Sequence, residues 1–226
     1  MQVYARARNF RLRIASNGEP VLSVPARGNI KDAKEFLNRQ KGWLLKRLDE
    51  RPKPVAFVEG AKFPIRAQIH QIFGTGKSRG QVEILTHEQE ILFETPKLLV
   101  PGGEKHMARR LRDWLKKEAY GDLEKASQHH AKTLGVNFSS INIKGQSSRW
   151  GSCSSSGRIN YNWRLIMAPE FVLDYVAAHE VAHLCEMNHS KAFWDKVLQT
   201  LPDMERGRDW LKENGNQLMV YGAKTK

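Results

Sequence analysis

The feature that most constrains this 226-residue chain is the pentapeptide His179-Glu180-Val181-Ala182-His183, which lies within an apolar segment. In an α-helix, residues four apart stand above one another, about 6 Å along the axis, so two imidazoles can bind one metal ion. Glu180 is turned about 100° from His179 around the axis, too far to join as a third ligand from the helix. It can instead accept a proton from water at the metal, so the pattern predicts a metal-dependent hydrolase.

The residues before the motif indicate where its helix begins. Ala168-Pro169-Glu170 places Pro at the first helical position and an acid in the first turn, and we expect the helix to continue to about Met187. The alternative is a helix whose histidines simply face solvent. On a largely buried helix, two histidines and a glutamate would carry an uncompensated desolvation cost, which favours the metal site.

A catalytic zinc ion usually takes three protein ligands and leaves a fourth position to water. Glu186 lies on the same face as the two histidines, but a straight helix places it about 7 to 8 Å along the axis from their midpoint. His189 is the favoured third ligand, because Asn188 tolerates the left-handed conformation that ends helices. Its spacing, six residues after His183, is that of H-E-x-x-H-x-x-G-x-x-H proteins. A more distant third ligand stays open. We expect Zn²⁺, although other divalent first-row ions also bind such a set.

Periodicity along the rest of the chain predicts an α+β protein with a β-rich N-terminal part and a helix-rich C-terminal part. Pro101-Gly102-Gly103 marks the expected boundary between a basic region with one helix, residues 1–100, and a metal-binding hydrolase domain, residues 101–226. The expected elements are a β-hairpin over 8–24 turning at Asn17-Gly18, a helix over 30–50 capped by Asn29, strands near 63–73, 81–86 and 90–94, and a long or once-broken helix over 104–134 that Gly135 ends. Extended segments at 138–144 and 158–167 follow, and then helices from Ser190 and after Pro202, the last ending near Gly215.

The composition indicates which partners and which cellular location to expect. The net charge is +13, and residues 1–60 hold 13 Lys and Arg against 6 Asp and Glu. Such a surface attracts polyanions, but a solvated basic surface is the simpler interpretation, so only a weak association with nucleic acid is expected. No apolar stretch approaches the roughly 20 residues that span a bilayer, and the N-terminus lacks an apolar signal core. With only Cys153 and Cys185 as thiols, we expect a cytoplasmic protein without disulfides or a membrane partner.

Motifs on both sides of the histidines carry a resemblance. They are Ser148-Arg149-Trp150-Gly151-Ser152-Cys153, Ile159-Asn160-Tyr161-Asn162-Trp163-Arg164-Leu165, Asp174-Tyr175-Val176, Asn188-His189-Ser190 and Phe193-Trp194. Together with the pentapeptide they resemble the YgjP-like metallopeptidase family, which is related to the SprT and WLM zinc peptidases. The resemblance is sharp over 145–211, looser over 8–50 and only in outline over 55–100.

The resemblance implies a zincin-like C-terminal part whose zinc is held by His179, His183 and His189, with Glu180 as the base. It also implies peptidase activity on a peptide or protein. Hydrolysis of nucleoside triphosphates such as UTP has been proposed for members of the family. The first alternative is therefore a nucleotide pyrophosphatase with the same ligands, which the +13 charge would also suit. A second alternative is a nucleic-acid-binding protein with a structural metal, but the sequence offers no evident fourth ligand to close the site.

Arg149, Asn162 and Trp163 are candidates for substrate binding. A cation at Arg149 near the metal would stabilise a developing oxyanion or a phosphate, although bracing the strand against the helix is equally compatible with the pattern. Asn162 and Trp163 precede the metal helix, where zincins carry a strand whose edge pairs with an extended peptide. That strand could equally be interior. His129 and His130 are adjacent on a polar helix, so both are predicted to lie at the surface.

Overall fold

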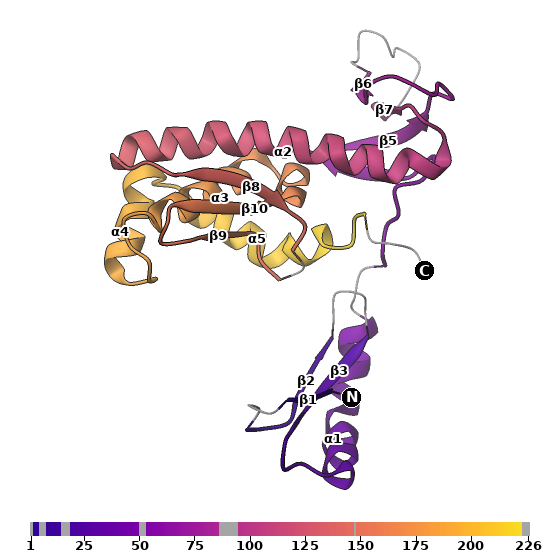
Figure 1. Ribbon diagram of the computed structural model, residues 1–226, viewed down its shortest axis with the longest axis vertical. Helices are drawn as coiled ribbons and strands as arrows, with labels where there is room; N and C mark the ends of the chain where they lie inside the picture. The colour runs from indigo at the N-terminus through magenta and orange to yellow at the C-terminus, as the bar shows by residue number, and fades with distance from the viewer. Residues whose placement is uncertain are drawn as a thin grey trace. The chain divides into compact units, whose positions relative to one another are not determined.

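In the computed structural model of the chain, the described residues are 2–4, 8–14, 19–49, 53–85, 95–146 and 148–222 (Figure 1). They form two compact units, residues 1–53 and residues 54–226. The boundary predicted between residues 100 and 101 falls inside the second unit. Strands dominate the N-terminal half and helices the C-terminal half, so the predicted α+β class is confirmed. Among the described residues, no helix is both long and apolar enough to cross a bilayer.

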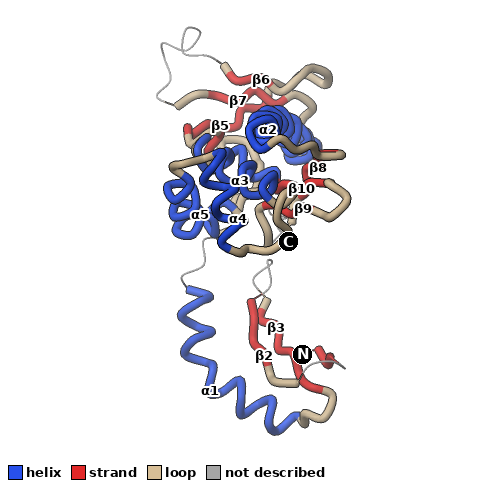
Figure 2. Tube along the Cα trace, turned by 90° about the vertical axis from the view of Figure 1, so that its left-hand side faces the viewer, coloured by secondary structure: helices blue, strands red, loops and turns tan. Residues whose placement is uncertain are grey.

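The first unit is a three-stranded sheet with one helix packed against it (Figure 2). The central strand β3 pairs in parallel with β1 and antiparallel with β2, and its Leu22 and Val24 form a small core with Ala33 of the helix. Asn29 Oδ1 accepts a hydrogen bond from the N–H of Asp32 at 2.8 Å, which caps the helix. The predicted hairpin strands and helix are confirmed, while the Asn17-Gly18 turn lies outside the described residues. The elements are β1 (Gln2–Tyr4), β2 (Arg11–Ile14), β3 (Pro20–Pro25) and α1 (Ile30–Asp49).

The second unit begins with a four-stranded sheet in the order β4-β5-β7-β6. The tip of its β4–β5 hairpin is anchored, because the N–H groups of Arg66 and Ala67 donate to the carbonyls of Ile166 and Met167. Arg66 also binds Asp122 at 2.8 Å. The strand predicted at 90–94 lies outside the described residues, and the strand just before Pro101 was not predicted. The strands are β4 (Lys62–Ile65), β5 (Gln68–Gly74), β6 (Glu83–Ile84) and β7 (Lys97–Val100).

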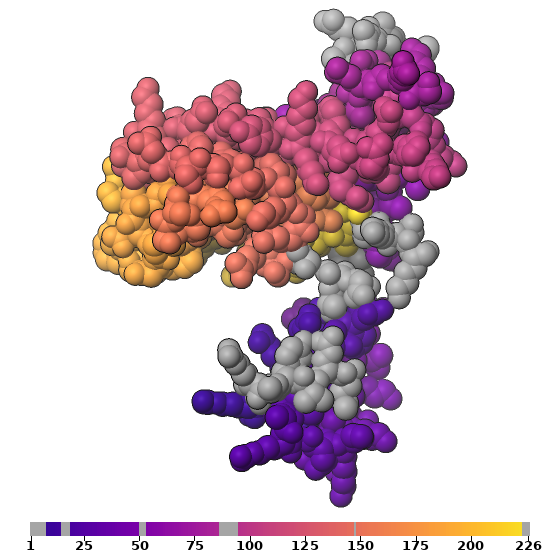
Figure 3. Space-filling model, in the orientation of Figure 1, coloured from indigo at the N-terminus to yellow at the C-terminus, as the bar shows by residue number. Residues whose placement is uncertain are grey.

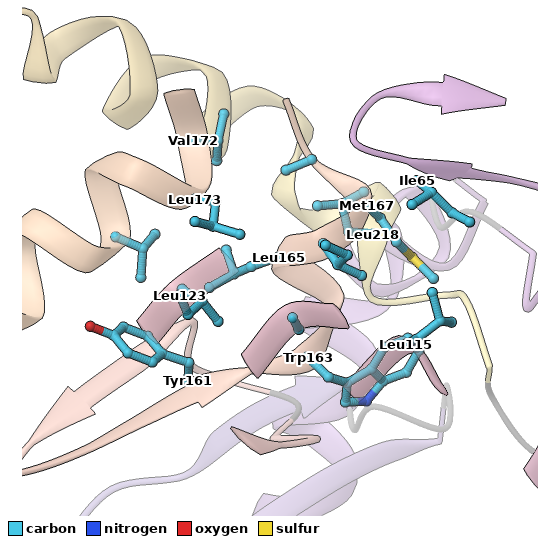
Figure 4. Close-up of a cluster of buried hydrophobic side chains, with 14 of the residues drawn as sticks. Ile65, Leu115, Leu123, Tyr161, Trp163, Leu165, Met167, Val172, Leu173 and Leu218 are labelled. Carbon is cyan, nitrogen blue, oxygen red and sulfur yellow. The ribbon is translucent and has the colours of Figure 1, made fainter. Parts of the chain in front are cut away.

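Helix α2 (Glu104–Leu134) is the longest element and runs unbroken through Gly121. A fully buried row of Leu111, Leu115, Ala119 and Leu123 recurs every four residues along one face. Leu115 and Leu123 of this row are labelled among the buried side chains in Figure 4. Gly135 ends the helix in the left-handed conformation, with φ 67° and ψ 32°, as the sequence predicted. Much of the second unit therefore packs against this helix.

A second sheet and three helices complete this unit. Strand β10 is central, parallel to β8 and antiparallel to β9, so β9 is an edge strand. The segment predicted as extended to residue 167 leaves the sheet after Asn162, because the Asn162 Oδ1 accepts the N–H of Arg164 and begins a 3₁₀ helix. The last helix continues past Gly215, where the sequence predicted its end. The elements are β8 (Ser140–Lys144), β9 (Gly151–Cys153), β10 (Arg158–Asn162), the 3₁₀ helix (Trp163–Met167), α3 (Glu170–Ala182), α4 (Lys191–Thr200) and α5 (Met204–Leu218).

His130 connects three of these helices. The prediction of a surface pair was wrong for this residue, since His129 is exposed but His130 is fully buried. Adjacent helical residues differ by about 100° in direction, so one can face the core and the other solvent. The His130 Nδ1 lies 2.7 Å from the Thr200 hydroxyl at the end of α4, and its Nε2 lies 3.0 Å from Asp174 of α3. His130 of α2 thus joins the helices on both sides of the predicted metal ligands.

Replacing Thr200 by Val tests this link. The substitution exchanges a hydroxyl for a methyl of similar shape and leaves a buried ring nitrogen without a partner, which costs about 1–3 kcal/mol. We expect the free energy of unfolding in urea to fall by that amount, while Thr200→Ser, which keeps the hydroxyl, loses less. Thr133→Val, at an exposed site on α2, is the matched control and should be nearly neutral. A Thr200→Val protein as stable as the wild type would show that this hydrogen bond does not hold the helices.

Candidate metal centre

The structure brings together the three histidines that the sequence singled out. One nitrogen each of His179, His183 and His189 lies within 4.8 Å of the others, and the Nε2 atoms of His179 and His189 are 3.0 Å apart. Tetrahedral zinc with bonds of about 2.0–2.1 Å holds its ligand nitrogens about 3.3 Å apart, so this spacing fits a single ion. Glu186, the alternative ligand, is not part of this cluster; its carbonyl instead lies 3.0 Å from the Nδ1 of His183.

An early end of α3 produces this convergence. The helix stops at Ala182, five residues before the predicted end at Met187, so that prediction was wrong. The N–H groups of Leu184 and Cys185 bond back to residues three before them, at 2.9 and 3.0 Å, which tightens the last turn. The sequence has no Gly or Pro at this position that would predict the end of the helix. Because the chain reverses here, His189 returns to the imidazole of His179.

The three imidazole rings pack against one aromatic side chain. Phe193 is fully buried, and its ring centroid lies 4.9, 4.5 and 4.8 Å from those of His179, His183 and His189. Ser190 caps the helix that carries Phe193 by accepting the N–H of that residue at 3.4 Å. The contact between His183 Nδ1–H and the Glu186 carbonyl leaves Nε2 for a metal. The packing therefore restricts all three rings.

Burial favours the neutral form of His179 and His183. Burial, together with the neighbouring His183 and His189, lowers the pKa of His179 to about 3. Burial also lowers the pKa of His183. The Nδ1 of His179 is buried and has no hydrogen-bond partner among the described residues. Since a metal binds the unprotonated imidazole, the donor set fits a borderline-soft ion such as zinc.

Glu180 lies beside the histidines and is 5% exposed. Its Oε2 has no hydrogen-bond partner in the described part of the chain. Burial raises the pKa of this carboxyl to about 8, and the positive charge of Arg149 opposes the rise. A carboxylate whose pKa lies near neutrality is suited to accept a proton in a reaction at that pH.

Gly151 shapes the space for this carboxylate. A Cβ at position 151 would overlap the Glu180 carboxylate oxygen and lie 2.6 Å from its Cδ and Cγ. The backbone of β9 therefore lies directly against the Glu180 side chain, and only glycine leaves room. Gly151 lies in one of the sequence motifs near the histidines, but no role could be predicted for it because nothing local to that motif shows which side chain faces it.

The three predicted substrate-binding residues lie in different surroundings. Arg149 is exposed, and its charge acts on Glu180. Asn162 and Trp163 are only 1% and 2% exposed, so their burial does not support direct contact with a substrate. The Asn162 amide donates to the carbonyls of Gln146, at 2.7 Å, and Arg149, at 3.1 Å. Asn162 thus holds the loop that carries Arg149.

Comparison with protein families shows which family this chain belongs to. The sequence matches the family model described as YgjP-like, metallopeptidase domain, over residues 8–214. The chain belongs to the YgjP-like metallopeptidase family. The resemblance seen in the motifs around the histidines is thereby confirmed, and the match includes residues from both compact units. No match was found among curated proteins.

Solved structures similar to part of this YgjP-like chain include two metallopeptidase zymogens. Abylysin of Pyrococcus abyssi has 24% sequence identity and a TM-score of 0.38, over 42% of this chain and 94% of that one. Jannalysin of Methanocaldococcus jannaschii has 21% identity and a TM-score of 0.35, over 42% and 96%.

Substituting Gly151 by Ala should impair the YgjP-like protein without removing its metal. The new methyl group would displace the Glu180 carboxylate, and positioned acid–base groups contribute about 10²–10⁴-fold to rates. We expect turnover to fall at least tenfold, with bound metal per chain and its affinity unchanged. Ser152→Ala, next to it on the same edge strand, is the control and should keep turnover near wild type. Equal turnover in both variants would show that Glu180 is not held by this contact.

The stability of the metal-free protein should also depend on pH, because the Glu180 carboxyl is buried. Because the pKa of Glu180 rises from 4.5 to about 8 on folding, its stabilising contribution is complete below pH 4.5 and is lost as pH rises toward 8. Glu180→Gln is neutral throughout, so it should stabilise chelator-treated protein at pH 8 but not at pH 4.5. The gain should grow by roughly 1 kcal/mol per pH unit across this window. Melting temperatures measure it, and a difference independent of pH would contradict the burial argument.

Proposed function

We propose that this YgjP-like protein is a zinc-dependent peptidase in which His179, His183 and His189 hold the ion and Glu180 is the general base. The observation that carries the proposal is the convergence of three imidazoles beside a buried carboxyl group that has an oxygen without a hydrogen-bond partner among the described residues. A zinc ion held there supplies Lewis acidity, which acidifies water and polarises the scissile carbonyl.

The protein's own groups have separate tasks in this proposal. Glu180 takes the proton from the attacking water and passes it to the leaving amine, and its raised pKa suits both steps near neutral pH. Arg149, exposed and electrostatically coupled to Glu180, stabilises the negative charge that develops on the substrate oxygen. Phe193 keeps water from the inner side of the imidazoles.

The edge strand β9 supports a peptide as the substrate. Among the described strands, β9 pairs only with β10, so its other edge has unpaired backbone groups. An extended peptide can add to such an edge through main-chain hydrogen bonds. Since Gly151 of β9 lies against Glu180, a peptide bound there would pass next to the base. The expected cytoplasmic location stays a prediction.

Glu180→Gln tests the proposal. The amide cannot accept the proton, so hydrolysis of an unfolded protein substrate by the zinc-loaded enzyme should fall by about 10²-fold or more. Metal content should stay near one ion per chain. Glu186→Gln, an acid in the turn after His183 whose side chain is not in the histidine cluster, is the matched control and should keep its activity.

A parallel assay separates the substrate classes. The same preparations are given a panel of nucleoside triphosphates, including UTP. Proteolysis that is lost in Glu180→Gln but kept in the wild type and in Glu186→Gln supports the peptidase. Triphosphate hydrolysis without proteolysis, lost in the same variant, would replace it with the pyrophosphatase alternative, and full activity of Glu180→Gln on either substrate would overturn the mechanism.

A further inference from the structure

Helix α1 is longer than the sheet it packs against. Its 20 residues extend about 30 Å, whereas the six residues of β3 extend about 20 Å. The core of the first unit takes Ala33, Phe36 and Leu37 from α1, all in its first half. Figure 2 shows the last turns of the helix standing apart from β2 and β3. The second half of α1 therefore contributes nothing to the described core of this unit.

This second half carries cations around an exposed tryptophan. Trp43 is 43% exposed, and Arg39 and Arg47, four residues before and after it, lie on the same face of the helix. Lys41 and Lys46 add two more exposed cations, and the sequence has no acidic residue from Phe36 to Leu48. Lys46 and Arg47 also complement the negative end of the helix dipole, but Arg39 and Lys41 lie too far from that end to do so.

The whole first unit has the same charge bias. Its described residues include eleven Lys and Arg side chains, all exposed, against four Asp and Glu. Long side chains project from its surface in the space-filling view (Figure 3). A net charge of +7 over these residues surrounds a core of only three buried residues, and such a surface attracts polyanions.

We infer that the second half of α1, residues 39–47, is a binding surface for single-stranded nucleic acid. Cations that follow the phosphates, with an aromatic ring on which a base stacks, are the elements of sequence-tolerant single-strand binding. An anionic membrane is the less suitable partner. Leu44 and Leu48 occupy the face between Trp43 and Leu45 but are half-buried, so a membrane would meet only two exposed apolar side chains, far fewer than an interfacial helix offers. The inference does not rest on the metal centre.

Fluorescence anisotropy of a labelled oligo-dT or oligo-U strand with the full chain tests the surface. The wild type should bind with a steep salt dependence. Replacing Arg39, Lys41, Lys46 and Arg47 together by Gln should weaken binding at least tenfold. It should also reduce the slope of log K against log salt by about three, since each phosphate contact contributes about 0.7. Trp43→Leu should weaken binding about tenfold and leave that slope nearly unchanged.

A matched variant distinguishes a surface from overall charge. Lys105, Lys117, Lys132 and Lys144 are exposed cations of the second unit, and replacing these four by Gln removes the same charge. This control should bind almost as tightly as the wild type, and circular dichroism should show α1 intact in every variant. Equal weakening in both quadruple variants would overturn the inference in favour of net charge. Preference for duplex over single strand, or binding only to phosphatidylserine vesicles, would overturn it as well.

Discussion

The candidate metal centre depends on a reversal of the chain between His183 and Ser190. Two imidazoles four residues apart can be supplied by any regular helix, but the third must return to them from beyond its end. The reversal is made by a tight turn after Val181 and Ala182 and is fixed by the Ser190 cap of α4. Because that helix also carries Phe193, the turn positions both the third imidazole and the aromatic ring that contacts all three imidazoles.

The centre is assembled at a cost to stability. Burial holds His179 far from its ordinary pKa and leaves one nitrogen of His179 and one oxygen of Glu180 without partners among the described residues. Unsatisfied buried groups each cost about 1–3 kcal/mol, so the surrounding packing must compensate. His130 is part of that packing, because it ties α2 to both helices next to the ligands. Binding of an ion to the folded state would offset the cost further.

The sequence predicted what depends on local spacing. The helical spacing of His179 and His183, the Asn29 and Ser190 caps and the Gly135 stop are all determined by residues within one or two turns. Prediction from the sequence was wrong or incomplete where tertiary contacts determine the structure. Asn162 ends β10 by capping a 3₁₀ helix while its amide holds a distant loop, and α3 ends without Gly or Pro. The space that requires Gly151 to be glycine belongs to a side chain 29 positions later in the chain.

The two units differ in what their residues are used for. The second unit has an extensive core and contains the whole metal centre, whereas the first buries three core residues and has mainly exposed charge. A family match over residues 8–214 includes nearly all of the first unit, so this small basic unit belongs to the family domain and is not an addition to it. A helix that extends about 10 Å beyond its sheet contributes little to the described core. Its apolar and cationic side chains are therefore better explained by a partner outside the unit than by the stability of its fold.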